Sequence, residues 1–162
     1  MKRIFPLLLG GLLLAVPLQG QEKPLPALYG TGTWNADSLG NHRIVVSVDK
    51  PSDAVLAVIQ WRRRDFNPEN KDLIVIDAKT GKRITNVCRF QINREKGEVV
   101  FQPQTVPGDY YIYYLKNISS GSKYYPTVTY PGFEETASAE WKKANRLTGK
   151  KAPELPQATV KQ

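Results

Sequence analysis

The sequence contains one short segment in which an aromatic ring, three cations and a carboxylate follow an apolar run: Trp61-Arg62-Arg63-Arg64-Asp65. Guanidinium groups hold carboxylates through paired hydrogen bonds, and an indole ring can stack on a cation or a sugar. Because side chains alternate along a strand, either Trp61 with Arg63 or Arg62 with Arg64 could share a face. Three interpretations stay open: local ion pairs with Asp65, docking to a partner domain, and contact with a sugar.

The other residues that could do chemistry form no recognisable catalytic set. The only histidine is His42, which excludes an HExxH motif and a multi-histidine metal site. No Gly-x-Ser-x-Gly sequence is present to expose a nucleophilic serine. His42 and Arg43 stand where the first expected strand begins, a place typical of turn or interface residues. The stretch from Asp65 to Glu69 begins like a calcium loop but lacks the central glycine and the closing glutamate.

Carboxylates are the groups that glycoside hydrolysis would need. That reaction uses two carboxyl groups on opposite sides of one bond, or one carboxyl group and the substrate's own amide. The candidates, each in an expected turn or at an expected helix start, are Glu95, Glu98, Glu134 and Glu135. Carboxylates in such places serve solubility and the helix dipole. We therefore expect no catalytic residue, no metal site and no cofactor in this chain.

The elements that position these residues are expected to be strands. Runs of apolar, β-branched and aromatic residues recur with turn signals between them, at 44–48, 54–61, 73–77, 84–92, 99–102 and 110–115. This spacing predicts an all-β fold, an antiparallel β-sandwich of the Ig-like or jelly-roll-like kind. Residues 124–130 could add an edge strand. Residues 134–147 predict one short C-terminal helix, anchored on the sandwich by Trp141.

Two of these runs make specific predictions about side chains. In the tyrosine-rich run, alternation places Tyr110 and Tyr114 on one face and Tyr111 on the other. A tyrosine directly after Pro-Gly-Asp resembles the corner tyrosine of sandwich domains, whose hydroxyl bonds to nearby backbone. In the run 84–92, the single cysteine, Cys88, is expected to be a buried, inert thiol on the same face as Ile84, Phe90 and Ile92.

The N-terminus has the three-part layout of a secretory signal peptide. Met1-Lys2-Arg3 is a basic head, and the leucine-rich stretch that follows is too short and too broken to span a membrane. The expected organisation is a signal peptide at 1–20, an N-terminal arm at 21–28, a sandwich domain with its helix at 29–148, and a linker towards a downstream domain at 149–162. The last stretch could also begin another strand.

These features predict an exported, periplasmic or extracellular protein with no membrane contact after signal cleavage. The formal net charge of the sequence is +8. A basic balance can indicate nucleic-acid binding, but an exported chain rarely meets nucleic acid. We therefore interpret the excess as a solvated basic surface and expect no nucleic-acid partner.

Five short segments occur in a set order and spacing: Gly40-Asn41-His42-Arg43, Trp61-Arg62-Arg63-Arg64-Asp65, Asp77-Ala78-Lys79-Thr80-Gly81, Asn93-Arg94-Glu95 and Pro107-Gly108-Asp109-Tyr110-Tyr111-Ile112-Tyr113-Tyr114. So arranged, they resemble the N-terminal β-sandwich domain of glycoside hydrolase family 123 type proteins, over about residues 29–155. These are exported bacterial enzymes that include β-N-acetylgalactosaminidases. The resemblance implies a sandwich that precedes a (β/α)₈ barrel, in which an adjacent Asp-Glu pair performs substrate-assisted hydrolysis of a 2-acetamido sugar. No Asp-Glu dipeptide occurs here, so no catalytic residue is carried over.

The sequence therefore predicts a non-catalytic N-terminal accessory sandwich of an exported, hexosaminidase-like glycoside hydrolase. Its expected partner is a downstream catalytic (β/α)₈ domain, and a glycan is a second candidate partner. The binding or docking candidates are Trp61, Arg62, Arg63, Arg64, Asp65, His42 and Arg43. A free-standing carbohydrate-binding module and a structural Ig-like domain stay open as alternatives.

Overall fold

The computed structural model describes residues 34–122 and 124–161. The expected signal peptide (1–20) and N-terminal arm (21–28) lie outside the described residues. The elements of the described part are α1 (Ala36–Leu39), β1 (His42–Val48), β2 (Val55–Gln60), a turn of 3₁₀ helix (Pro68–Asn70), β3 (Leu73–Asp77), β4 (Arg83–Ile84), β5 (Val87–Ile92), β6 (Lys96–Phe101), β7 (Gly108–Tyr114), β8 (Ile118–Gly121), β9 (Pro126–Thr129), α2 (Ala139–Ala144) and β10 (Gln157–Val160).

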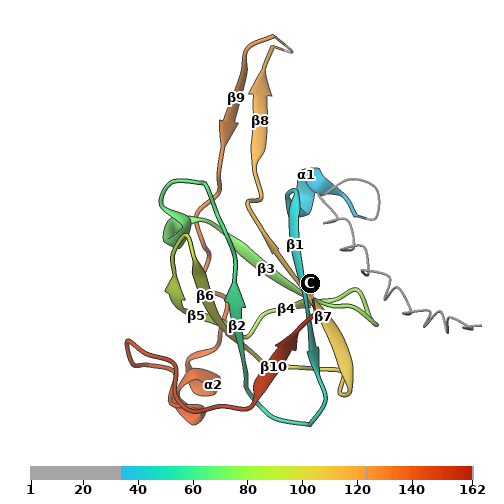
Figure 1. Cartoon of the computed structure of the whole chain (residues 1–162), viewed down its shortest axis with the longest axis vertical. Helices are drawn as coiled ribbons and strands as arrows, with labels where there is room; N and C mark the ends of the chain where they lie inside the picture. The colour runs from blue at the N-terminus through green and yellow to red at the C-terminus, as the bar shows by residue number, and fades with distance from the viewer. Residues whose placement is uncertain (1–33, 123, 162) are drawn as a thin grey trace, which may run out of the picture.

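Eight of these strands form one sheet, in the order β4-β3-β7-β1-β10-β2-β6-β5 (Figure 1). Side chains from both halves of this sheet, β4-β3-β7-β1 and β2-β6-β5, meet in one apolar core. Phe101 of β6 and Tyr110 of β7 are in contact across that core, with ring centroids 4.9 Å apart. The sheet therefore folds over on itself, and the expected all-β, sandwich-like fold is confirmed.

Strand β10 closes the fold and has no counterpart in the purely antiparallel arrangement that we expected. It pairs antiparallel with β1 and parallel with β2. Because β1 and β2 run in opposite directions, a strand inserted between them must be parallel to one of the two. Ala158 of β10 is buried in the core. The stretch expected as a linker or a further strand thus contributes a strand of the sheet at residues 157–160.

Alternation along the strands accounts for the core. Ile44, Val46 and Val48 of β1 face inward, as the period-2 pattern predicts. Strand β2 is apolar on both faces because both of its faces are covered. Its inner face lies in the main core, whereas Leu56 on its outer face lies in a second cluster with Trp141 of α2.

Helix α2 is shorter than the predicted 134–147. Trp141 anchors it on the sandwich, as predicted. The segment before α2 is held out of the helix by loop 85–86, since Thr136 Oγ1 donates to the carbonyl of Thr85 (2.6 Å) and the amide of Ser138 donates to Asn86 Oδ1 (2.9 Å). Ser138 then caps the helix by accepting the amide of Trp141 (3.1 Å). Helix formation therefore starts only at residue 139.

Cys88 is buried as expected, but the prediction of which residues share its face is partly wrong. Cys88 and Phe90 lie in the cluster under α2, whereas Ile84 and Ile92 belong to the main core. The run is divided because β4 ends at Ile84 and the pairing register of β5 shifts between Arg89 and Ile92. Burial raises the pKa of the Cys88 thiol to about 11, so the thiol is protonated at neutral pH.

Candidate domain-docking site

The site is built on the chain that leaves β2, at one end of the sandwich. The amide of Trp61 donates to the carbonyl of Glu95 (3.0 Å) and that of Arg63 to the carbonyl of Arg94 (2.8 Å). These bonds extend the β2–β6 pairing beyond Gln60, so side chains continue to alternate. Trp61 and Arg63 turn inward, and Arg62 and Arg64 turn to solvent. We call this end of the sandwich, residues 61–65 with the adjoining ends of β1 and β7, the arginine end.

Trp61 is a buried part of the arginine end. Only 4% of its surface is exposed, and its indole Nε1 donates to the carbonyl of Asn93 (2.7 Å). Its ring packs against that of Tyr114, with centroids 5.2 Å apart. Gly97 lies under the indole, where any Cβ would collide with the ring. Trp61 is therefore unavailable for stacking on a sugar.

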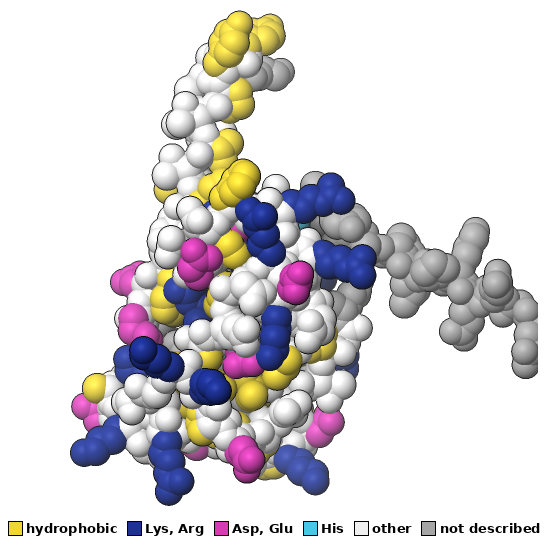
Figure 2. Space-filling view, turned by 60° about the vertical axis from the view of Figure 1, so that its left-hand side comes forward, with side chains coloured by type: hydrophobic (Ala, Val, Ile, Leu, Met, Phe, Trp, Pro, Cys, Tyr) yellow, Lys and Arg dark blue, Asp and Glu magenta, His cyan; other side chains and the backbone are white. Residues whose placement is uncertain are grey.

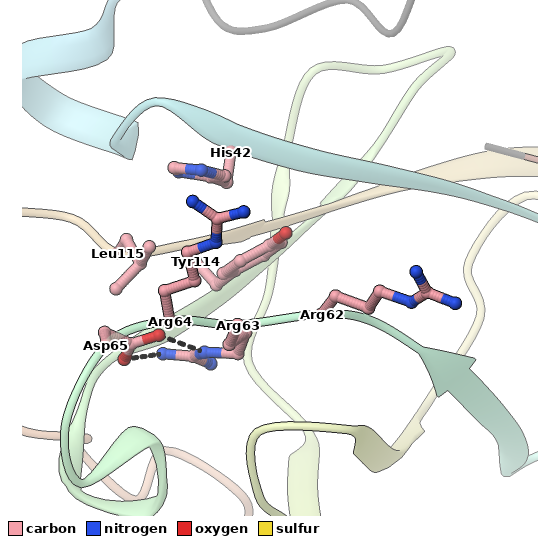
Figure 3. Close-up of a pocket in the computed structure, with 7 residues that line it drawn as sticks. All are labelled: His42, Arg62, Arg63, Arg64, Asp65, Tyr114 and Leu115. Carbon is pink, nitrogen blue, oxygen red and sulfur yellow. Dashed lines mark hydrogen bonds and ion pairs between the residues drawn. The ribbon is translucent and has the colours of Figure 1, made fainter.

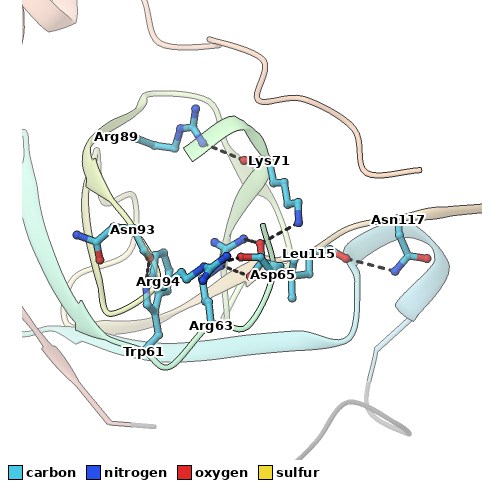
Figure 4. A network of polar contacts seen from close by, with 9 residues as sticks. All are labelled: Trp61, Arg63, Asp65, Lys71, Arg89, Asn93, Arg94, Leu115 and Asn117. Carbon is cyan, nitrogen blue, oxygen red and sulfur yellow. Dashed lines mark hydrogen bonds and ion pairs between the residues drawn. The ribbon is translucent and has the colours of Figure 1, made fainter. Parts of the chain in front are cut away.

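Arg63 forms a buried ion pair with Asp65 (Figure 4). Its Nε and Nη2 donate to the two carboxylate oxygens of Asp65, at 2.9 and 2.7 Å, and Lys71 Nζ donates to the same carboxylate at 2.9 Å. The Arg63 side chain is only 2% exposed, and its guanidinium carbon lies 5.0 Å from the ring centroids of both Trp61 and Tyr114. A forked ion pair between aromatic rings satisfies a cation that burial would otherwise penalise.

The same contacts fix the charge of Asp65. Burial alone would raise the pKa of this carboxyl group, but the hydrogen bonds and charges of Arg63 and Lys71 lower it to about 2. Asp65 is therefore ionised at neutral pH, with its charge neutralised locally. A general acid for glycoside cleavage needs a raised pKa, so Asp65 is unsuited to that role.

Arg62 and Arg64 are exposed cations of this end, as is Arg94. Arg62 and Arg64 border two open cavities, of about 580 Å³ and about 620 Å³. The first is shared with His42, Tyr114 and Leu115, and the second with Gln60, Arg94 and Glu95. Figure 3 shows Arg64 reaching towards His42 while Arg62 points the other way. Two forked donors thus stand at the rim of the arginine end and point in different directions.

His42 joins the arginine end from β1. Its ring lies 5.2 Å from that of Tyr114, and its Nδ1 is a buried atom without a hydrogen-bond partner among the described residues. Burial lowers the pKa of His42, and the charge of Arg63 lowers it further, against the opposing effect of Asp65. The imidazole is therefore neutral at neutral pH.

Arg43 lies apart from the other candidates, because neighbouring residues of β1 point to opposite faces. Its guanidinium carbon is 4.4 Å from the ring centroid of Trp34 and 4.5 Å from that of Tyr111. Trp34 is itself fixed by a hydrogen bond from its Nε1 to the carbonyl of Gly40 (2.8 Å). Arg43 therefore packs between two rings.

Sequence reasoning missed several residues that complete the arginine end. Tyr114 could have been found, since alternation along the tyrosine run puts it on the core face. Lys71, Arg94 and Leu115 carry no comparable signal, because they reach the site from a loop, a hairpin turn and a strand end. Within residues 34–122 and 124–161, no group of three or more His, Cys, Asp or Glu side chains could hold a metal ion. No helix of that part is long and apolar enough to cross a membrane.

The fold and this site define a β-sandwich domain with a rigid, cationic end. Residues 32–162 match the family model described as glycoside hydrolase 123, N-terminal domain, so the chain belongs to that family. The resemblance carried by the five sequence segments is thereby confirmed. Membership implies a further catalytic domain in the parent protein. No curated protein and no solved structure matches the chain.

Proposed function

We propose that this domain is a non-catalytic accessory module of an exported, hexosaminidase-like glycoside hydrolase, and that its arginine end docks to the catalytic (β/α)₈ domain. The observation that carries the proposal is that the three arginines differ in burial and pairing. Arg63 is buried and paired with Asp65, whereas Arg62 and Arg64 are exposed on the same segment. Arginine on a rigid surface is typical of protein interfaces.

Two findings favour docking over the other interpretations of this segment. The ion pair of Arg63 with Asp65 accounts for one arginine only and leaves Arg62 and Arg64 without that local role. Sugar contact through Trp61 is disfavoured by the burial of the indole. An acidic surface on the catalytic domain would complement two exposed guanidinium groups.

The test uses the parent two-domain protein with Arg62→Glu and Arg64→Glu introduced together. Small-angle X-ray scattering should show a larger radius of gyration for this variant than for the wild type, because the domains separate. Lys150→Glu with Lys151→Glu is the matched control, since these exposed lysines follow α2 at the opposite end of the sandwich (Figure 1). An unchanged radius of gyration in the arginine variant would overturn the docking.

The non-catalytic role is tested on the chain alone. The purified chain should release no product from an aryl 2-acetamido glycoside, because the site offers no carboxyl group held as an acid. Release above the level of the substrate alone would show that the proposed role is wrong.

A further inference from the structure

The hairpin of β8 and β9 projects from the sandwich as a separate two-stranded sheet of the described chain (Figure 1). Its two strands pair only with each other, from Ile118 with Thr129 to Gly121 with Pro126. All eight strand residues are exposed. We expected an edge strand of the main sheet at 124–130; the observed β9 belongs to a separate ribbon. Isolated two-stranded hairpins are marginal in water, so this ribbon favours a surface on which it can pack.

The exposed side chains of the hairpin are apolar and aromatic. Tyr124 and Tyr125 at its tip are 86% and 84% exposed, and Ile118, Val128 and Tyr130 are also exposed. Figure 2 shows hydrophobic side chains along the projection up to its tip. Between Asn117 and Tyr130 the sequence has a single charged residue, Lys123, among serines, threonines and tyrosines. Interface cores have this composition, rich in tyrosine and poor in charge.

The base of the hairpin is continuous with the arginine end. Leu115, which borders the first cavity, lies three residues before β8. At the other strand, Lys71 Nζ lies 4.2 Å from the ring centroid of Tyr130 and also binds Asp65. The amide of Asp72 donates to the carbonyl of Pro131 (3.0 Å), which fixes the returning chain. The arginine end and the β8–β9 hairpin thus form one surface.

We propose that the β8–β9 hairpin is the apolar half of the docking surface and packs, through Tyr124 and Tyr125, on the catalytic domain of the same parent protein. The inference rests on the proposed docking of the arginine end. The orientation of β10 supports this partner over others. This strand runs parallel to β2, so its carboxyl end points to the end of the sheet that carries Arg62 and Arg64. Buried aromatic anchors beside a charged rim are the usual division within an interface.

The experiment compares amide hydrogen exchange in the parent protein and in this chain alone. We expect exchange at 118–122 and 124–130 to slow by about tenfold or more in the parent, because packing suppresses local opening. Tyr124→Ser with Tyr125→Ser in the parent should abolish this protection and leave that of 61–65 in place. The matched control, Ser119→Ala with Ser120→Ala, should leave both regions protected.

Each other outcome contradicts the inference in its own way. Protection of 61–65 without the hairpin would overturn the hairpin contact while the docking of the arginine end stands. Protection of neither region would overturn both. Protection that grows with concentration of the chain alone would identify a second copy as the occupant, and protection by a 2-acetamido oligosaccharide alone would identify a glycan.

Discussion

At the residue scale, Tyr110, which directly follows Pro107-Gly108-Asp109, is the corner tyrosine. Its hydroxyl donates to the carbonyl of Thr105 (2.6 Å) and accepts the amide of Thr105 (2.8 Å). Burial raises the pKa of Tyr110, so the hydroxyl keeps its proton. The ring is fully buried, and the hydroxyl therefore ties the loop before β7 to the core.

Tyr110→Phe should lower the free energy of unfolding by about 1–3 kcal/mol, because it leaves two backbone groups of Thr105 without a partner. Tyr111→Phe is the matched control. It should change stability by less than about 0.5 kcal/mol, since the phenyl ring that contacts Arg43 is kept. Urea unfolding of the three proteins measures both effects. Equal losses in the two variants would show that Tyr110 is no corner.

The ion pair of Asp65 gives the domain a defined dependence on acid. Its folded pKa of about 2 lies below the ordinary value of 3.8, so its stabilisation is present above pH 3.8 and is lost as the pH falls towards 2. The contribution is about 2 kcal/mol at neutral pH. The difference in free energy of unfolding between wild type and Asp65→Asn should therefore be constant above pH 4 and shrink below it. A difference that does not vary between pH 4 and pH 2 would contradict the lowered pKa.

Part of this site could be predicted from the sequence, and the limit has a physical reason. Period-2 alternation separates Arg63 from Arg62 and Arg64, and proximity suggests Asp65 as a partner for an arginine. Which arginine is buried could not be predicted, because that depends on Tyr114 and Trp61 meeting across the core. The contact of Lys71 with Asp65 could not be predicted either, because a loop brings Lys71 to that carboxylate.

At the element scale, β10 joins the two halves of the sheet. It fills the gap between β1 and β2, and its Ala158 lies in the core. The amide of Lys161 donates to the carbonyl of Val45 (2.8 Å), and its Nζ pairs with Asp109 (2.6 Å). The end of the described chain is thus tied to β1 and β7.

A chain that ends at Pro156 should be less stable than one that ends at Lys161. Removing 157–161 opens the edges of β1 and β2 and exposes core side chains, which also invites edge-to-edge association. Thermal unfolding and size-exclusion chromatography of the two chains test this expectation. Equal melting temperatures, with both chains monomeric, would mean that β10 contributes little to the fold.

The strands were easier to predict than their arrangement. Strands β1, β2, β3, β5 and β7 fall on apolar runs with turn residues around them, and such a signal is local. The two-residue β4 and the first half of β6, Lys96 to Glu98, carry no such run. The pairing of residues 157–160 with two distant strands is not local, and neither is the projection of β8 and β9. The segment 124–130 has strand composition, but its large side chains have no core to face.

At the scale of the whole molecule, the two ends of the sandwich differ. One end carries the buried pair of Arg63 and Asp65, the exposed Arg62 and Arg64, and the apolar hairpin. The other is closed by α2 and the loop after it (Figure 1). A surface that combines a stiff cationic platform with exposed aromatic side chains is suited to burial against a second folded domain. The central claim is that the arginine end is covered in the parent protein.

Chemical footprinting of arginine tests that claim most directly. Phenylglyoxal modifies accessible guanidinium groups, and peptide mass spectrometry locates them. In this chain alone, Arg62 and Arg64 should react while the buried Arg63 does not. In the parent protein Arg62 and Arg64 should become protected, and Arg146, exposed after α2, should react equally in both. Equal modification of Arg62 and Arg64 in the chain and in the parent would contradict the account.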